Sequence, residues 1–252
     1  MLDLGKYWRG EITARRDLSD DLWTARLRLP APFPFRPGQY ATLALEDEEG
    51  VHERPYSIVS SPLEKELEFF FELVPQGELT PRLHRLQPGD PIWVRKAAKG
   101  LFQWDRKSGR DRHLMVCTVT GLAPFMSMLR TFAADSSQRP PGHRGLLLAA
   151  ASRSWEFGYR AEALELAQTL PDLQAVFSIS RPWEDSQWRG ERGRAEDLLR
   201  KYADQEGFGA GITTAYLCGH PGMIANAKDI LKRAGFDKQA IYEEIYWIPA
   251  KP

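Results

Sequence analysis

The chain passes from strand to helix in one short stretch, Thr118-Val119-Thr120-Gly121-Leu122-Ala123-Pro124-Phe125. The apolar run before it predicts a strand that ends at Thr118, and the glycine permits a tight turn. Pro124 suits the first turn of a helix, because proline lacks an N–H that has no helical partner there. The stretch therefore predicts a strand–turn–helix unit whose helix N-terminus favours a phosphate. It lacks the G-x-G-x-x-G spacing of a dinucleotide fingerprint.

Downstream of this unit, apolar runs and stretches with helical spacing alternate. Strands are expected at residues 113–118, 146–151, 173–179 and 214–218, and helices at 124–134, 162–169, 195–202 and 221–234. Such alternation implies a mostly parallel sheet wound with helices. Sheets of this kind bind ligands at the carboxyl ends of their strands.

The first hundred residues instead show short apolar runs separated by glycine, proline and acidic turns. Strands are expected at residues 8–16, 22–29, 39–45, 53–59, 67–73 and 91–95, and residues 79–86 have helical spacing with Thr80-Pro81 as a possible start. Thr80 is the possible cap of that helix, and Pro81 its possible first-turn proline. The pattern of short strands favours a closed antiparallel barrel. The polar stretch 104–111 is predicted to be a linker. Two domains are therefore expected, at residues 1–105 and 106–252.

Composition excludes several functional classes. The chain has 252 residues, 42% of them hydrophobic and 27% charged, and a formal net charge of zero. The charge balance argues against nucleic acid as a partner, since proteins that bind it are usually basic. The N-terminus lacks the apolar core of a signal peptide, and no run of about 18 apolar residues is present. A cytoplasmic protein without a membrane span is expected.

The cysteines and histidines predict no metal site. Two cysteines, Cys117 and Cys218, are too few for a cysteine-ligated iron–sulfur cluster or a Cys₄ zinc site. They also make no disulfide framework, which favours a reducing compartment. The five histidines show no ligand spacing and are interpreted as structural or exposed. Cys117 is expected in the core of its strand.

The stretch Arg54-Pro55-Tyr56-Ser57 lies on a predicted strand of the first half. Side chains alternate faces, so Arg54 and Tyr56 share one face, and Ser57 points the other way unless the strand ends there. A guanidinium can pair with a diphosphate, a phenol ring can cover a flat heterocycle, and a hydroxyl can bond to a ring nitrogen. A flavin nucleotide would suit these groups. The alternative is a barrel strand with a surface ion pair and a buried tyrosine.

In their order along the chain, these motifs resemble the ferredoxin–NADP⁺ reductase family, in particular its short bacterial members. The resemblance covers nearly the whole chain. It is carried by Gln39-Tyr40, Arg54-Pro55-Tyr56-Ser57, Gly77-x-Leu79-Thr80, Gly121-Leu122-Ala123-Pro124-Phe125 and Cys218-Gly219-x-Pro221-x-Met223. It implies an N-terminal antiparallel Greek-key β-barrel that binds FAD, followed by a C-terminal α/β domain with a parallel sheet that binds NADP(H).

The resemblance also implies roles for individual residues. In the barrel, the residues implied to bind FAD are Arg54, Pro55, Tyr56, Ser57, Val74, Leu79 and Thr80, with Tyr56 stacked on the flavin. Ser57, Thr120 and Cys218 are implied to lie beside the reacting atoms of the flavin and nicotinamide, and a small buried residue is the alternative for Cys218. Either Tyr246 or Trp247 in the tail is implied to contact FAD. Val119 stands where the family usually has glycine, and its bulk is expected to affect how the nicotinamide nucleotide binds.

Arginines near consecutive strand ends favour NADPH over NADH. The 2′-phosphate needs cations, and arginine offers two parallel donors. An NAD enzyme would more often place an acid on the ribose. The residues expected at this end of the coenzyme are Arg153, Ser180, Arg181 and Arg194. Solvated arginines at loop starts are the alternative.

The function implied by the resemblance is hydride transfer between NADP(H) and FAD, with single electrons passed to or from ferredoxin or flavodoxin. These carriers are usually acidic, and Arg95, Lys96 and Lys99 are candidate docking residues on a protein expected to be a monomer. Two alternatives stay open. One is a reductase that supplies an oxygenase or free flavin, and the other is a non-catalytic nucleotide-binding regulatory module.

Overall fold

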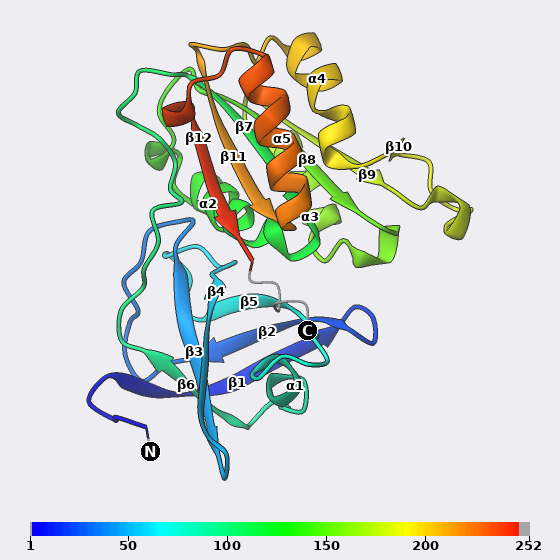
Figure 1. The fold of residues 1–252 in the computed structure, drawn as a ribbon. Helices are drawn as coiled ribbons and strands as arrows, with labels where there is room; N and C mark the ends of the chain where they lie inside the picture. Colours follow the sequence, from blue (N-terminus) through cyan, green and yellow to red (C-terminus); the bar gives the residue numbers. More distant parts are fainter. Residues whose placement is uncertain (1, 247–252) are drawn as a thin grey trace. The chain divides into compact units, whose positions relative to one another are not determined.

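The computed structural model describes residues 2–246 and divides into two compact units (Figure 1). The first unit contains the residues up to Gln103 together with Ala123–Thr131. The second contains Trp104–Leu122 and the residues from Phe132 onward. Each unit has its own sheet and its own hydrophobic core.

The first unit is a curled antiparallel sheet of six strands in the order β4-β3-β6-β1-β2-β5. The strands are β1 (Tyr7–Asp17), β2 (Leu22–Arg28), β3 (Tyr40–Asp47), β4 (Gly50–Ser57), β5 (Leu67–Glu72) and β6 (Pro91–Arg95). Just beyond β4, Ile58 forms a bridge with Phe69 of β5, so the two edges of the sheet meet. The antiparallel barrel predicted from the short strands is confirmed.

The core of this unit follows from the alternation of side chains along its strands. Leu67, Phe69 and Phe71 of β5 all belong to it, as does Trp23 of β2, whose ring stacks on Phe71 at 5.2 Å between centroids. Aromatic and branched side chains at alternate positions therefore fill the space inside the curl.

The helix predicted over residues 79–86 is a single turn, α1 (Thr80–Leu83). Pro81 lies in the first turn as expected, but Thr80 is not the cap, because Leu79 is the N-cap and makes no side-chain cap bond. Leu79 and Leu83 are both buried in the core of the first unit. This apolar pair gave the sequence its helical spacing, although the chain makes only one turn there.

The second unit is a parallel sheet in the order β10-β9-β8-β7-β11-β12. Its strands are β7 (Arg112–Thr118), β8 (Arg144–Ala151), β9 (Leu173–Ile179), β10 (Glu191–Arg192), β11 (Thr213–Gly219) and β12 (Ile241–Ile245). The helices of this half of the chain are α2 (Ala123–Ala134), most of which belongs to the first unit, and α3 (Arg160–Thr169), α4 (Ala195–Glu206) and α5 (Pro221–Arg233) of the second. Helices α4 and α5 lie side by side on one face of the sheet (Figure 1). The predicted α/β architecture is confirmed. No helix in the described part of the chain is both long and apolar enough to cross a membrane.

The prediction of a linker at residues 104–111 is wrong at its start. The Trp104 ring stacks on His113 with 3.8 Å between centroids, and Asp105 is buried. The Asp105 backbone N–H donates to the Tyr216 hydroxyl at 2.8 Å, and the Thr214 hydroxyl donates to the Asp105 carboxylate at 3.0 Å. Because these bonds satisfy the polar groups, a stretch without an apolar period can still pack into the second unit.

Candidate nucleotide-binding sites

In the first unit, the Arg54–Ser57 stretch forms the end of an edge strand. Pro55 is accommodated there because one side of an edge strand has no neighbour to hydrogen-bond. Tyr56 lies opposite Ala41 of β3, and its ring packs edge-on against Phe71 at 4.9 Å. Burial raises the pKa of Tyr56, so its hydroxyl stays protonated. Strand β4 ends at the buried Ser57, which leaves the side-chain direction of Ser57 free of the strict alternation.

Arg54 connects this strand to the predicted phosphate turn. Its guanidinium donates to the Glu78 carboxylate at 2.6 Å and to the Glu53 carbonyl at 2.8 Å. Glu78 immediately precedes Leu79, the N-cap of α1. Two motifs that lie more than twenty residues apart in the sequence are therefore brought together in one unit.

The turn that leads into α1 is closed by Thr80 and Val74. The Thr80 hydroxyl accepts from the Val74 N–H at 3.0 Å and donates to the Val74 carbonyl at 3.2 Å. The Gly77 N–H donates to the same carbonyl at 2.8 Å, and a Cβ at Gly77 would lie only 3.0 Å from it. Since the Leu79 side chain is in the core, only its backbone is available to a ligand.

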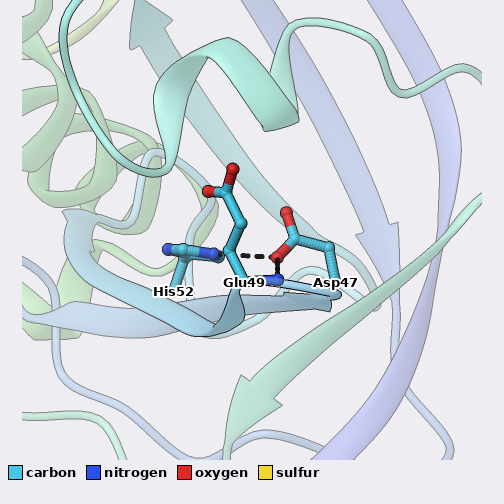
Figure 2. A group of neighbouring side chains, drawn as sticks. All are labelled: Asp47, Glu49 and His52. Atoms are coloured by element: carbon cyan, nitrogen blue, oxygen red, sulfur yellow. Dashed lines mark hydrogen bonds and ion pairs between the residues drawn. The ribbon is translucent and has the colours of Figure 1, made fainter.

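An acidic group lies on the β3–β4 hairpin, where Asp47, Glu49 and His52 come close together (Figure 2). The His52 Nε2 lies 3.0 Å from the Asp47 carboxylate. Arg82 of α1 pairs with both carboxylates, and its Nε lies 2.5 Å from Asp47. The guanidinium lowers the pKa of Asp47 to about 2. Arg82 already supplies the positive charge that balances the two carboxylates. The group therefore attaches α1 to the hairpin through ion pairs, and we do not interpret it as a metal site.

In the second unit, two glycines let the ends of β7 and β11 approach closely. A Cβ at Gly121 would lie 2.3 Å from the Cys218 carbonyl oxygen, so no larger residue fits. Gly219 has a φ of +122°, and its Cβ would lie 2.4 Å from the Thr118 hydroxyl. The carboxyl ends of the neighbouring strands β7 and β11 thus meet at backbone distance.

Val119 occupies this turn with a φ of +43°. A branched side chain in the left-handed region is an outlier, because its Cβ crowds the carbonyl oxygen that follows it. The residue begins a 3₁₀ turn, Val119–Leu122, between β7 and α2. Val119 therefore brings backbone strain to this turn in addition to the bulk of its side chain.

Three predicted residues meet at this edge of the second sheet: Thr120, Cys218 and Tyr246. The Tyr246 hydroxyl donates to the Thr120 carbonyl at 3.0 Å, and it also lies within hydrogen-bonding range of the Cys218 thiol. Burial raises the pKa of Cys218 well above its ordinary value, and the Glu244 carboxylate adds to the shift. Cys218 is therefore a neutral thiol and not a nucleophile. Trp247 lies outside the described residues.

The predicted arginines lie beyond the ends of β8 and β9. The Arg181 N–H donates to the Ser152 carbonyl at 3.0 Å, which places Arg153 and Arg181 on neighbouring segments. Glu184 accepts from the Arg153 Nε at 2.6 Å and lies 3.6 Å from the Arg181 guanidinium. Glu184 is a site residue that the sequence analysis missed, and its spacing of three residues from Arg181 is the signal that could have found it.

The other two residues predicted to bind the adenosine end, Ser180 and Arg194, both make backbone hydrogen bonds. Ser180 is half-buried, and its N–H donates to the Ala151 carbonyl at 2.9 Å. Arg194 is exposed at the start of α4, where its backbone N–H donates to the Asp197 carboxylate at 3.0 Å. Arg194 is therefore anchored through its backbone and leaves its guanidinium at the surface.

Comparison with known proteins agrees with this division. Residues 9–104 match the family of oxidoreductase FAD-binding domains, and residues 115–229 match the family of oxidoreductase NAD-binding domains. The chain is 29% identical over 244 residues to the naphthalene 1,2-dioxygenase system ferredoxin–NAD(P)(+) reductase component of Pseudomonas putida, covering 95% of this chain and 69% of that protein. It is 36% identical over 121 residues to the flavodoxin/ferredoxin–NADP reductase of Escherichia coli strain K12, covering 48% of each.

A solved structure has the same fold. It is a ferredoxin NADP⁺ reductase from Neisseria gonorrhoeae with bound FAD and NADP, which superposes with a TM-score of 0.83 at 24% identity and covers 95% of this chain and 98% of that one. The two matched domains follow each other in the order predicted from the motifs. The matched domain families confirm the predicted classes of cofactor, FAD and a nicotinamide dinucleotide. The chain therefore belongs to the ferredoxin–NADP⁺ reductase family of FAD-dependent oxidoreductases.

Proposed function

We propose that this protein takes hydride from NADPH onto FAD and passes single electrons to a small acidic carrier, ferredoxin or flavodoxin. The observation that carries the proposal is the backbone contact of Gly121 with Cys218, which packs the strand ends tightly beside Thr120. A Cβ on Gly121 would collide with the Cys218 backbone, so only glycine permits this approach. When bound, FAD supplies the chemistry that converts one hydride into two single-electron transfers. The protein contributes binding and orientation.

The first unit offers groups that fit FAD. Arg54 supplies the cation for a diphosphate, and the α1 turn supplies backbone N–H groups beside it. Tyr56 supplies an apolar ring, and Ser57 supplies a hydroxyl at the end of the strand. Glu78, which now holds Arg54, would have to share its guanidinium with the ligand.

The second unit offers groups that fit the nicotinamide dinucleotide. Thr120 and Cys218 are proposed to bind its nicotinamide end, where a neutral thiol can pack against a ring without reacting with it. Tyr246, which contacts both residues, remains the candidate for the tail aromatic that touches a cofactor ring. Arg153, Ser180, Arg181 and Arg194 are proposed to bind the adenosine end. No side-chain base is required, since a hydride moves without a separate proton.

The proposed docking of the carrier depends mainly on two lysines. Lys96 and Lys99 are exposed, whereas Arg95 is paired with the Glu53 carboxylate at 2.6 Å. An acidic carrier would be attracted to the lysines over a distance of about 10 Å at moderate ionic strength. Electron transfer to it should therefore slow as salt is raised.

A reductase that supplies an oxygenase is the second candidate. It is favoured by the Pseudomonas relative, whose name places it in a dioxygenase system and whose similarity extends over 95% of this chain. Both candidates share the same flavin chemistry. They differ in the protein that receives the electrons, so the carrier decides between them.

The test is to purify the protein, identify its bound flavin and mix it anaerobically with NADPH or NADH. Rapid bleaching of the flavin absorbance by NADPH is expected, with slower bleaching by NADH. Flavin that stays oxidised with both coenzymes contradicts the enzyme proposal and favours a regulatory module. Equal rates with both contradict the argument from the arginines. Adding oxidised flavodoxin, plant-type ferredoxin or an oxygenase ferredoxin to the reduced protein then identifies the carrier.

A further inference from the structure

The arginines at the ends of β8 and β9 are already engaged by a carboxylate. Glu184 closes the 3₁₀ turn Pro182–Glu184 and contacts the guanidinium groups of both Arg153 and Arg181. The side chains remain accessible, with 28% of Arg153, 49% of Arg181 and 34% of Glu184 exposed. A dissolved ligand can therefore reach all three groups.

The backbone holds Glu184 in this position. The next residue, Asp185, is buried, and its carboxylate accepts from the Ser154 N–H at 3.1 Å. On the neighbouring turn, the Glu156 carboxylate accepts from the Ser152 N–H at 2.8 Å and pairs with Arg153 at 3.2 Å. The two turns are thus tied to each other, and Glu184 cannot leave the arginines by a movement of its loop alone.

A carboxylate and a phosphate compete for the same guanidinium donors. The 2′-phosphate distinguishes NADPH from NADH, which carries a hydroxyl at that position. A phosphate that approaches Arg153 and Arg181 meets the negative charge of Glu184 and must displace its hydrogen bonds or share them. The 2′-hydroxyl of NADH carries no charge, so Glu184 does not repel it and its hydrogen bonds need not be displaced.

We propose that Glu184 is a specificity-determining residue, which competes with the 2′-phosphate for Arg153 and Arg181 and so limits the preference for NADPH over NADH. The proposal rests on the function proposed above, because it assumes that the adenosine end binds at these strand ends. A site with paired arginines would then still accept NADH. It also identifies a single carboxylate whose removal should sharpen the choice of coenzyme.

The test measures binding of adenosine 2′,5′-bisphosphate and of 5′-AMP to the FAD-loaded protein by calorimetry. Glu184→Gln keeps the size of the side chain and removes its charge. We expect it to tighten binding of the bisphosphate about three- to tenfold, since both exposed ion pairs of Glu184 and its repulsion of the phosphate are lost. Binding of 5′-AMP should change less than about twofold. Glu165→Gln is the matched control, an exposed glutamate of α3 with no ion pair among the described residues, and should change neither affinity.

Two results would overturn the proposal. Unchanged binding of the bisphosphate in Glu184→Gln would show that the carboxylate does not compete, and weaker binding would show that Glu184 orients the arginines for the phosphate. If NADPH still reduces the flavin in either case, only the role of Glu184 fails. If neither nucleotide binds and the flavin stays oxidised, the proposed function itself fails.

Discussion

Val119 is the residue whose backbone conformation least suits its side chain. Its φ of +43° costs a residue with a Cβ roughly 1–2 kcal/mol, whereas glycine pays about 0.5–1 kcal/mol in lost freedom of the unfolded chain. Val119→Gly should therefore raise the free energy of unfolding by about 0 to 1.5 kcal/mol. The midpoint of urea unfolding measures this change.

The matched control is Val51→Gly in β4. Val51 is exposed and has an ordinary strand conformation, so glycine there only adds entropy to the unfolded chain and should cost about 1 kcal/mol. If Val119→Gly lowers the unfolding midpoint as much as Val51→Gly does, the strain at Val119 is not present in solution.

Most single-residue contacts of the site could not be predicted from the sequence. The Arg54–Ser57 stretch could be assigned to a strand end because proline and alternation constrain the backbone. The contact of Glu184 with Arg153 and that of Tyr246 with Thr120 join residues 31 and 126 positions apart. Such pairs depend on how separate strands align, which the local sequence does not specify.

Among the elements, the buried strands were predicted best and the edges worst. β8 is buried along nearly all its length and reads as a continuous apolar run, as expected for a central parallel strand. β12 was missed because it is an edge strand whose Glu243 faces Lys228 at 2.6 Å, so acidic residues interrupt its apolar pattern. The short edge strand β10 pairs through only two residues, both charged, so the sequence shows no apolar run there.

The ion pairs between Arg82 of α1 and the β3–β4 hairpin predict how stability depends on pH. Arg82 lowers the pKa of Asp47 to about 2, below the value near 3.8 that the residue has when unfolded. The stabilisation by this pair is therefore complete above about pH 4 and is lost as the pH falls towards 2. Arg82→Gln should lower the urea midpoint slightly at neutral pH, and its difference from the wild type should shrink in acid. The pair is exposed, so the effect should be small and weaken with salt.

Arg9→Gln is the matched control for that experiment. Arg9 is an exposed residue of β1 that forms no ion pair within residues 2–246, so it has no carboxylate partner to protonate. Its difference from the wild type should stay nearly constant over the same acid range. A difference for Arg82→Gln that does not change between about pH 5 and pH 2 would mean that Arg82 does not stabilise the charged form of Asp47.

At the level of the whole second unit, a buried histidine links stability to pH. The ring of His113 is fully buried beneath Trp104, with its Nδ1 3.0 Å from the Tyr216 hydroxyl and its Nε2 2.6 Å from the Nδ1 of His143. A neutral ring can donate at one nitrogen and accept at the other, which suits both neighbours. The lack of ligand spacing predicted that this histidine would be structural or exposed, but not that a second histidine would stack against it.

Burial lowers the pKa of His113 to about 3, and the neighbouring His143 adds to the shift. The unfolded chain binds a proton at this residue near pH 6.5, so between these two values the unfolded state holds more protons than the folded state. The stabilisation by neutral His113 is therefore complete above about pH 6.5 and falls as the pH decreases, by up to about 1.4 kcal/mol per pH unit. Replacing the ring with a side chain that does not titrate should remove that slope.

His113→Gln tests this, because glutamine keeps a donor and an acceptor. We expect the variant to be less stable than the wild type at about pH 7, since it packs less well beneath Trp104, and the gap to narrow as the pH falls to about 5. The control is Phe132→Leu, which also loosens the packing against Trp104 but does not titrate, so its difference from the wild type should stay nearly constant. The measurement is the free energy of urea unfolding at several pH values. A gap between His113→Gln and the wild type that stays constant would mean that His113 does not resist protonation in the fold, and the stacked ring cluster would then contribute packing alone.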